Sequence, residues 1–242
     1  MSGDIKKVSI VIPAYNEEKT IGELLKKVVD VDIPIKKEVI IVNDGSTDNT
    51  EKIVQDFIKK YKNLQNLDII LINKKNEGKG SALKLGISKS SGDIIIIQDA
   101  DLEYDPNDYM KLIKPIMNGN FKVVYGSRIK NPNNNYSHIS YLLGGLFITL
   151  LTNLLYFTFL TDEPTCYKVF HKDLKDILIN AEGNKFDWEP EITAKILRKG
   201  YTIHEVPINY YPRKLNEGKK IKWMDGVDAV ITLIKWRFKK ID

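Results

Sequence analysis

The sequence predicts an α/β protein built on an open, mostly parallel β-sheet that is flanked by helices. Short, almost wholly apolar runs alternate with longer segments of helical periodicity through the first half of the chain. Most of these runs end in polar or acidic clusters. Because ligands of such sheets bind beyond the carboxyl ends of the strands, these clusters mark the expected site.

Five strands are expected, because five short runs are dominated by apolar residues, as in parallel strands that are covered on both faces. They occupy residues 8–13, 38–44, 67–73, 93–98 and 121–128. The stretch GDIIIIQDADLEYDP (92–106) shows the pattern most clearly, since four isoleucines run directly into a cluster of carboxylates.

Helices are expected between these strands. We predict Asn16 as the N-cap of the first, with Glu17 and Glu18 in its first turn. Asp48 is expected to cap the second helix, and Asp105 followed by Pro106 is a typical helix start.

Composition sets further limits on the protein. A length of 242 residues with 43% hydrophobic residues fits one large domain, or one domain with an appendage. The single cysteine, Cys166, excludes an internal disulfide framework and fits a reducing compartment. The chain reaches its first strand almost at once, so we expect no secretory signal.

Two segments of the second half stand out by charge. Residues 131–161 contain no Asp, Glu, Lys or Arg, and their part 141–160 is long enough to cross a bilayer as one helix. Residues 213–242 hold nine lysines and arginines against four acids, which accounts for the whole net charge of +5. We expect this basic tail to attract anionic lipid, and we expect no nucleic-acid partner.

The carboxylates that follow the fourth strand predict a metal site. Asp99, Asp101 and Glu103 stand at alternate positions, so in an extended segment they point the same way. Clustered anions destabilise one another unless a cation neutralises them, and an all-oxygen set suits Mg²⁺ or Mn²⁺ bound with substrate phosphates. A solvated acidic loop is the alternative.

Several motifs together resemble the family 2 glycosyltransferases. These are VSIVIPAYNEEKTIGELL, IIVNDGSTDNT and GDIIIIQDADLEYDP, in that order. VVYGSR, TDEPTCYKVF, EVPINYYPR and EGKKIKWMDG are similar to the branch that transfers sugars to polyprenyl phosphates, such as the dolichyl-phosphate mannosyl- and glucosyltransferases. The resemblance covers about residues 6–226.

The resemblance implies the GT-A fold, a Rossmann-like, mostly parallel sheet flanked by helices, with membrane-interface helices toward the C-terminus. It divides the chain into a nucleotide-sugar-binding core (1–130), a membrane-interface or acceptor-binding segment (131–161) and an acceptor-side remainder (162–242). The implied reaction is metal-dependent transfer of mannose or glucose, with inversion, from GDP-mannose or UDP-glucose to dolichyl or undecaprenyl phosphate.

The same resemblance assigns roles to residues of this sequence. The implied nucleotide-sugar contacts are Pro13, Ala14, Tyr15, Glu17, Asp44, Asp99 and Ala100. The implied metal ligands are Asp99, Asp101 and Glu103, although family members often have Gln at the last position. The implied catalytic residues are Asp101, with Arg128 and Arg213 at the acceptor phosphate.

Other interpretations stay open. A hydroxyl acceptor would need a general base, for which the candidates are Asp162, Asp187, Glu189 and Glu191. Without the resemblance, Asp44 reads as a turn residue, Arg128 as part of a surface salt bridge and Arg213 as part of a solvated basic face. Lys79 is a candidate to contact a phosphate, but we favour its interpretation as a flexible loop lysine. A third possibility is an inactive module that binds nucleotide sugars at a membrane.

The uncharged segment raises a question of topology. If 141–160 crossed the bilayer once, Asp101 and Arg213 would lie on opposite sides, so we do not expect a single span. A packed core helix is one alternative. We favour helices in the membrane surface, broken at Gly144-Gly145 and Asn153, on a protein attached peripherally to the cytoplasmic face. A membrane-anchoring partner or a homo-oligomer stays open.

Overall fold

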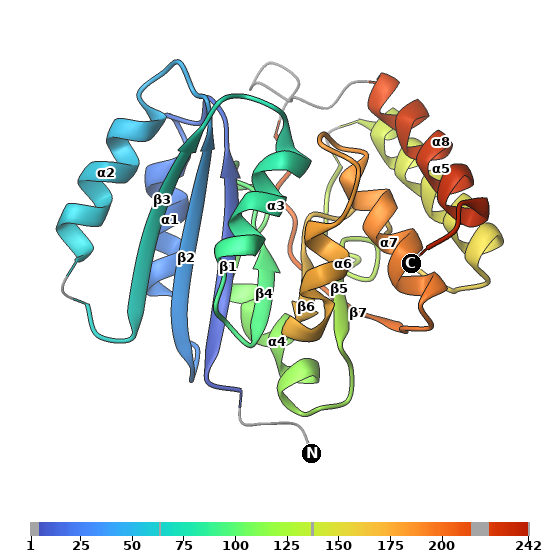
Figure 1. Ribbon diagram of the computed structural model, residues 1–242, viewed down its shortest axis with the longest axis horizontal. Coiled ribbons are helices and arrows are strands. Elements are labelled where there is room, and N and C mark those ends of the chain that lie inside the picture. The colour runs from blue at the N-terminus through green and yellow to red at the C-terminus, as the bar shows by residue number, and fades with distance from the viewer. Residues whose placement is uncertain (1–4, 63, 137, 214–222, 242) are drawn as a thin grey trace.

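A computed structural model describes residues 5–62, 64–136, 138–213 and 223–241. Within these ranges seven strands form one sheet, in the order β3-β2-β1-β4-β6-β5-β7 (Figure 1). The strands are β1 Lys7–Ala14, β2 Lys36–Asp44, β3 Leu67–Lys74, β4 Ile94–Ile97, β5 Val123–Ser127, β6 Lys168–His171 and β7 Ile203–Pro207.

The five strands expected from the apolar runs are confirmed as β1 to β5. β1 to β4 pair in parallel, and β7 pairs in parallel with β5. β6 is antiparallel to both of its neighbours, β4 and β5. β6 and β7, in the segment after residue 161, complete the sheet, which is mostly parallel as predicted.

Helices cover both faces of the sheet (Figure 1). The helices α1, α2 and α4 follow β1, β2 and β4, whereas α3 packs against β1 and β2 and is joined on its face by α6 and α7. Their bounds are α1 Ile21–Asp30, α2 Thr50–Tyr61, α3 Lys79–Lys89, α4 Tyr109–Met117, α6 Lys175–Ile179 and α7 Trp188–Arg198. Short 3₁₀ turns, η1 Pro106–Asp108 and η2 Lys172–Leu174, precede α4 and α6.

The centre of the sheet is buried. All four residues of β4, Ile94–Ile97, are buried, and β1 and β2 bury most of their side chains beside it. Burial of one such side chain contributes about 1.5–3 kcal/mol. α3 lies close on this surface because Gly86 has no side chain: a Cβ there would lie 2.5 Å from Val11 Cγ1. The core therefore fixes the strand ends that carry the polar clusters.

The predicted cap at Asn16 is wrong. α1 begins at Ile21, and Asn16 has a positive φ of 49° in the loop before it. There Asn16 Oδ1 accepts a hydrogen bond from the Thr47 amide (2.8 Å), which joins the loop after β1 to the loop after β2. The cap at Asp105 is confirmed, since its carboxylate accepts from the Asn107 amide (3.0 Å).

The uncharged segment forms one continuous helix, α5 Ile139–Tyr156, so the predicted breaks at Gly144-Gly145 and Asn153 are wrong. A helix tolerates isolated glycines at about 1 kcal/mol each. Asn153 acts at the end of the helix: its side chain bonds both the N–H and the carbonyl of Leu160 (2.8 Å each). By length and composition α5 is able to cross a membrane, a test that some core helices also pass.

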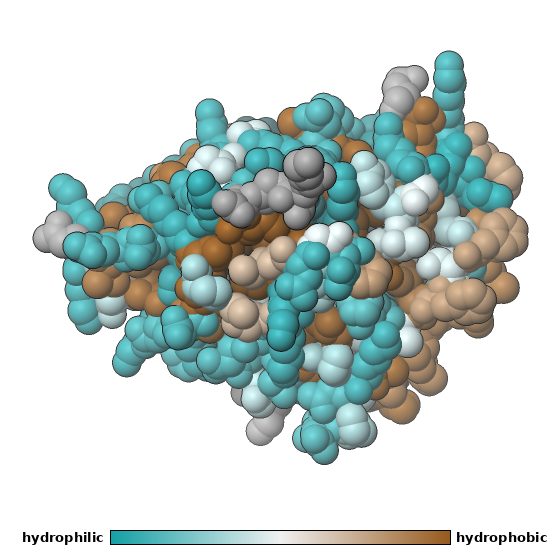
Figure 2. All heavy atoms as spheres, turned by 90° about the horizontal axis from the view of Figure 1, so that it is seen from below, coloured by the Kyte–Doolittle hydropathy of each residue, from teal (hydrophilic) through white to brown (hydrophobic). Residues whose placement is uncertain are grey.

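α5 is not a core helix, because only 17% of this apolar helix is buried. One side packs on α8 Trp223–Phe238 and on α7, through Ile148, Tyr156, Ala194, Leu233 and Trp236. Apolar side chains of α5 and α8 are exposed on the other side. Figure 2 shows apolar residues gathered at the end of the molecule where these helices lie.

Candidate active site

The predicted site lies at the carboxyl edge of the parallel strands. Ala14 ends β1 and pairs with Asn43 of β2, so the loops that follow these two strands start side by side. β4 adds the third loop, which begins with Gln98, whose N–H donates to the Val11 carbonyl (3.0 Å). Pro13, Ala14, Asp44, Asp99 and Ala100 therefore lie at one edge of the sheet.

Asp101 and Arg213 lie together, although 112 positions separate them in the chain. Arg213 Nε donates to the Asp101 carbonyl (2.9 Å), and Arg213 Nη2 is 4.0 Å from Asp101 Oδ2. Nη2 also donates to Glu17 Oε2 (2.9 Å). Arg213 is thus largely buried between the loops that follow β1 and β4. It is not part of a solvated basic face, although lysines 214, 219, 220 and 222 lie outside the described residues.

Glu103 holds the segment that carries Arg213. Its carboxylate accepts from the Arg213 amide (2.8 Å) and from the Tyr210 hydroxyl (3.3 Å), and its own carbonyl accepts from the Tyr211 amide (2.9 Å). The side chain is buried. Glu103 therefore anchors residues 210–213, a role for which the sequence offered no signal.

Asp99 is paired with a lysine that the sequence interpretation treated as flexible. Lys79 Nζ lies 2.7 Å from Asp99 Oδ1 and 2.8 Å from Glu189 Oε1. All three side chains are mostly buried. The interpretation of Lys79 as a flexible loop lysine is wrong. The glycines around it are the missed signal, because they let its loop pack closely on the start of α7.

Asp101 carries excess negative potential. Burial, followed by repulsion from Asp99 and Glu103, raises the pKa of Asp101 to about 7, and the Arg213 guanidinium only partly offsets this. A carboxylate in such surroundings favours a bound cation. The hard oxygens of Asp99 and Asp101 fit Mg²⁺ or Mn²⁺ shared with a diphosphate.

Glu103 fits this metal role less well. Its carboxylate already accepts the bonds from Tyr210 and Arg213. Among the described residues, no three Asp, Glu, His or Cys side chains are grouped as ligands of one ion. We therefore retain Asp99 and Asp101 as candidate ligands that bind the ion together with substrate.

Asp44 organises the loop between β3 and α3. Its Oδ1 accepts from Lys74 Nζ (2.9 Å) and the Glu77 amide (3.1 Å), and its Oδ2 accepts from the Gly78 amide (2.9 Å). Asp44 is buried at the end of β2. This aspartate is more than a turn residue, because it connects the loop of Lys79 with the expected nucleotide pocket.

Arg128 forms a bidentate salt bridge with Asp162. Its Nε and Nη2 donate to the two carboxylate oxygens (2.8 and 2.7 Å), and its backbone N–H adds a third bond (2.8 Å). The guanidinium also lies over the Tyr210 ring, with its carbon 5.2 Å from the centroid. Arg128 is therefore not part of a surface salt bridge, and Tyr210 connects it to Glu103 and the Arg213 segment.

Most of the candidate bases for a hydroxyl acceptor have structural partners. Asp162 is held by Arg128, and Asp187 accepts from the Lys185 amide (2.8 Å). Glu191 accepts from two backbone amides (2.7 Å each) and lies 2.6 Å from Lys195 Nζ. Glu189 is the member of this group that contacts the Asp99 cluster, through Lys79.

The single cysteine and two of the histidines have structural surroundings. Cys166 is buried. His171 accepts from the Asp173 amide (3.3 Å), and the His204 ring stacks on Phe121 with centroids 4.3 Å apart. These histidines lie away from the carboxylate cluster.

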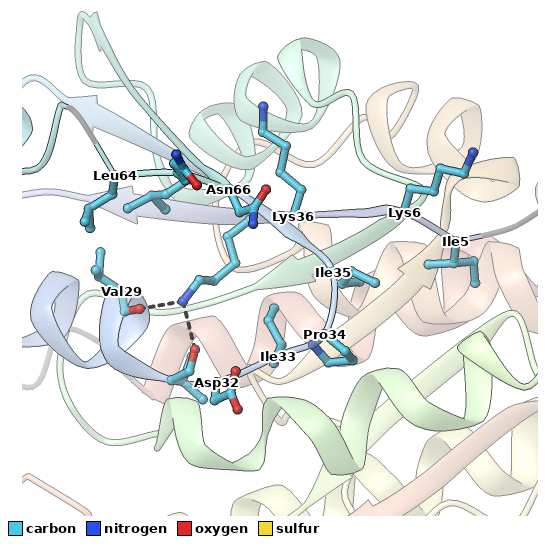
Figure 3. Close-up of a pocket in the computed structure, with 14 residues that line it drawn as sticks. Ile5, Lys6, Val29, Asp32, Ile33, Pro34, Ile35, Lys36, Leu64 and Asn66 are labelled. Atoms are coloured by element: carbon cyan, nitrogen blue, oxygen red, sulfur yellow. Dashed lines mark hydrogen bonds between the residues drawn. The ribbon is translucent and has the colours of Figure 1, made fainter.

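A groove lies at the opposite edge of the sheet, beside the amino ends of β1, β2 and β3 (Figure 3). Lys37 lines this groove and donates to the carbonyls of Val28 (3.3 Å), Val29 (2.5 Å) and Val31 (2.8 Å) at the end of α1. A lysine in this place satisfies helix carbonyls that have no partner within the helix. The groove is a helix-end feature and is separate from the carboxylate site.

Comparison with known proteins decides the family. A model of glycosyl transferase family 2 matches residues 9–178, more than half of the chain. The chain belongs to glycosyltransferase family 2. It is 27% identical over 243 residues to a dolichyl-phosphate β-glucosyltransferase (ALG5D) of Trichomonas vaginalis, with 94% of this chain and 72% of the relative covered.

A second relative comes from Methanococcus voltae. It is the UDP-N-acetylglucosamine–dolichyl-phosphate N-acetylglucosaminyltransferase, 29% identical over 249 residues, with 98% of both chains covered.

Solved structures confirm the GT-A fold. Glucosyl-3-phosphoglycerate synthase from Mycobacterium tuberculosis, crystallised with Mn²⁺, UDP and glucosyl-3-phosphoglycerate, superposes with a TM-score of 0.71 at 19% identity. The alignment covers 96% of this chain and 80% of that one. The same enzyme has also been crystallised with Mg²⁺ and UDP.

Proposed function

We propose that this family 2 glycosyltransferase transfers a hexose from a nucleotide sugar to a polyprenyl phosphate, with inversion at the anomeric carbon. The observation that carries the proposal is the position of Arg213 against Asp101 and Glu17. A buried guanidinium at the end of the donor strands suits a phosphate, because its fork binds two oxygens at once.

The donor side is formed by the loops after β1, β2 and β4. Asp44 lies where the base is expected, and Tyr15 and Glu17 border the same edge. Asp99 and Asp101 would hold a divalent ion with the donor diphosphate. When bound, that ion stabilises the charge of the leaving diphosphate as a Lewis acid. Arg213 orients the acceptor against this group, and its bond to the Asp101 carbonyl fixes the separation of the two.

A phosphate acceptor fits the arrangement better than a hydroxyl acceptor. A phosphate monoester has a second pKa of about 6 and is already mostly dianionic at neutral pH, so it needs no general base. The candidate bases Asp162, Asp187 and Glu191 are occupied by structural hydrogen bonds. Direct attack by the phosphate oxygen inverts the sugar configuration.

The names of the relatives favour a UDP sugar as the donor. One relative is a glucosyltransferase and another uses UDP-N-acetylglucosamine, both with dolichyl phosphate as acceptor. We therefore place UDP-glucose and UDP-N-acetylglucosamine ahead of GDP-mannose. Dolichyl and undecaprenyl phosphate share the headgroup that Arg213 would bind.

The exposed apolar faces of α5 and α8 fit an enzyme that acts at a lipid surface. Leu150 and Leu154 of α5 and Ile231 of α8 are each more than half exposed, and Arg237 and Lys240 add positive charge near the end of α8. Such a face favours the boundary between headgroups and acyl chains. We place the enzyme peripherally on the cytoplasmic face of a membrane, where its lipid acceptor also lies.

The test is a transfer assay on purified protein with a short-chain polyprenyl phosphate and Mn²⁺. UDP-glucose, UDP-N-acetylglucosamine and GDP-mannose are compared as donors, and the matching polyprenol without phosphate is the control acceptor. We expect lipid-linked product of inverted configuration from the phosphate and none from the alcohol. Equal transfer to the polyprenol or to a glycan hydroxyl would refute the phosphate-acceptor assignment.

A further inference from the structure

The Lys79 ammonium lies beside the Asp99 carboxylate and compensates its negative charge. Its ammonium bridges two carboxylates from distant parts of the chain, Asp99 after β4 and Glu189 in the first turn of α7. Lys79 is only 15% exposed, and its partners are 20% and 12% exposed. Three buried charged groups in one cluster are costly unless they compensate one another.

The chain holds this lysine firmly. Lys79 is the first residue of α3 and follows Gly78, whose amide is fixed by Asp44. On its other side, a Cβ at Gly80 would lie 2.7 Å from Trp188 Cβ. The Ser81 amide donates to the Asn184 carbonyl (2.9 Å) and pins the loop to the segment before α7. The position of Lys79 is therefore set by backbone contacts.

The ammonium stays charged in this cluster. It lies between two carboxylates, 2.7 Å from Asp99 Oδ1 and 2.8 Å from Glu189 Oε1, and both stabilise its positive charge. A divalent ion at Asp99 would lie within a few ångströms of this charge, and like charges in a partly buried site repel strongly. The free protein therefore already contains a cation that competes for one of the two candidate metal ligands.

We propose that Lys79 is a built-in counter-cation: it neutralises Asp99 while no metal is bound, and it keeps Glu189 as its partner when a divalent ion takes Asp99. The proposal rests on the metal-dependent function proposed above. Its consequence is that the free enzyme binds the ion weakly on its own. The donor diphosphate then makes up the affinity, because it brings negative charge that both the ion and Lys79 can share.

The experiment measures Mn²⁺ binding to the nucleotide-free protein by calorimetry or by the spin resonance of free Mn²⁺. Lys79→Met removes the charge while keeping the length of the side chain, and we expect Mn²⁺ to bind about tenfold or more tightly. Lys79→Arg keeps the charge and should stay within about twofold of wild type. Weaker or unchanged Mn²⁺ binding in Lys79→Met would overturn the proposal.

Lys74→Met is the matched control. It removes a lysine from the same loop that contacts Asp44 and Glu77 but not Asp99. Its Mn²⁺ affinity should remain that of wild type, whereas tightening equal to that of Lys79→Met would show a general charge effect and refute a specific role for Lys79.

Glu189→Gln should change the Mn²⁺ affinity in the direction opposite to Lys79→Met. With Glu189 neutral, Lys79 keeps only Asp99 as a charged partner, so Mn²⁺ should bind several-fold more weakly. In the Lys79→Met background the same change should have a much smaller effect, because its route through the lysine is gone. Equal effects in both backgrounds would contradict the coupling.

The measurements also separate this proposal from the proposed reaction. If Lys79→Met tightens Mn²⁺ while the wild type transfers no sugar to polyprenyl phosphate, the acceptor assignment falls and the counter-cation stands. If transfer is found but Lys79→Met does not bind Mn²⁺ more tightly, only the counter-cation falls. If neither protein binds Mn²⁺ in the absence of nucleotide, the counter-cation is refuted, whereas the metal role is refuted only if sugar transfer also does not depend on a divalent ion.

Discussion

At the scale of single residues, the proposed phosphate acceptor is tested at Arg213. We expect Arg213→Ala to raise the KM for lipid phosphate or lower turnover by about 10- to 100-fold, because a charged bond contributes about 1.5–3 kcal/mol. Nucleotide binding should change little. Arg213→Lys should rescue only in part, since the ammonium lacks the fork.

Asp101→Asn is the complementary variant, and the two are compared by titration with the metal–nucleotide complex beside kinetics with a soluble short-chain acceptor. Asp101→Asn should weaken binding of the metal–nucleotide complex first. The acceptor role of Arg213 is contradicted if Arg213→Ala weakens nucleotide binding as much as Asp101→Asn does.

Asp44 is the second residue-scale prediction. Its carboxylate accepts three bonds from the loop of Lys74, Glu77 and Gly78, so Asp44→Asn removes one charge without changing the shape. We expect the dissociation constant of the nucleotide donor to rise by about tenfold or more. Calorimetry with the nucleotide gives the constant, and Lys74→Met controls for loosening of the loop. Unchanged nucleotide affinity in Asp44→Asn would leave this carboxylate a purely structural role.

At the scale of elements, sequence patterns succeeded where a strand carries its own signal. The runs that became β1 to β5 are dominated by apolar residues, so each was predicted from local residues alone. β6 and β7 are no shorter than β4 and β5, but they mix charged with apolar side chains, so their pairing depends on the partners beside them. The carboxylate cluster was predicted in the same local way.

Contacts between distant elements could not be predicted in this way. Lys79 was misread because its partners Asp99 and Glu189 lie 20 and 110 positions away in the chain. The role of Glu103 as the anchor of Tyr210 and Arg213 likewise depends on contacts across more than 100 positions. Spacing along the sequence carries no information on such pairs.

The amino ends of β1 and β2 carry a prediction on pH. Glu38 of β2 is buried and accepts from Lys7 Nζ (2.8 Å) and from the amide and hydroxyl of Ser91 (2.8 and 2.6 Å). Burial alone would raise the pKa of Glu38, but the bonds from Lys7, Ser9 and Ser91 outweigh it and lower the pKa to about 2.

Because the pKa of Glu38 is lower in the folded protein than in the unfolded chain, its contribution to stability is full above about pH 4.5 and is lost as the pH falls toward 2. Glu38→Gln should cost about 2–3 kcal/mol of unfolding free energy at pH 7 and progressively less below pH 4. Urea midpoints at pH 7, 4 and 3 measure the gap, with Glu23→Gln on the surface of α1 as control. A gap that stays constant with pH would refute the linkage.

At the scale of the whole molecule, the candidate active site connects to the exposed apolar side of α5 and α8. β5 ends at Ser127, the Arg128–Asp162 pair follows, and α5 begins only at Ile139. The Glu163 amide, next to Asp162, donates to Thr149 of α5 (3.0 Å), so the Arg128–Asp162 pair lies beside the helices that expose leucine, isoleucine and phenylalanine. A lipid acceptor with an anionic head and an apolar tail matches that order of surfaces.

The last prediction tests this face by its apolar area. Phe147, Leu150 and Leu154 of α5 are 57%, 57% and 65% exposed, so replacing all three by serine should leave the urea midpoint nearly unchanged. Each of these side chains contributes about 1.5–3 kcal/mol of transfer free energy when it inserts into the membrane surface. The triple serine variant should therefore no longer sediment with lipid vesicles. Ile70→Ser, which changes an exposed apolar residue on β3, is the matched control and should bind vesicles as wild type does.

Charge is tested separately with Arg237→Gln and Lys240→Gln near the end of α8. These changes should weaken binding to anionic vesicles, increasingly so at low salt, and leave binding to neutral vesicles unchanged, because each basic residue near the surface contributes about 1 kcal/mol. With both sets of variants, the KM should rise for a long-chain polyprenyl phosphate in vesicles and much less for a soluble short-chain acceptor. If the serine variant still sediments with vesicles, or loses both acceptors equally, α5 is not the lipid-contacting surface and its exposed face must serve another partner.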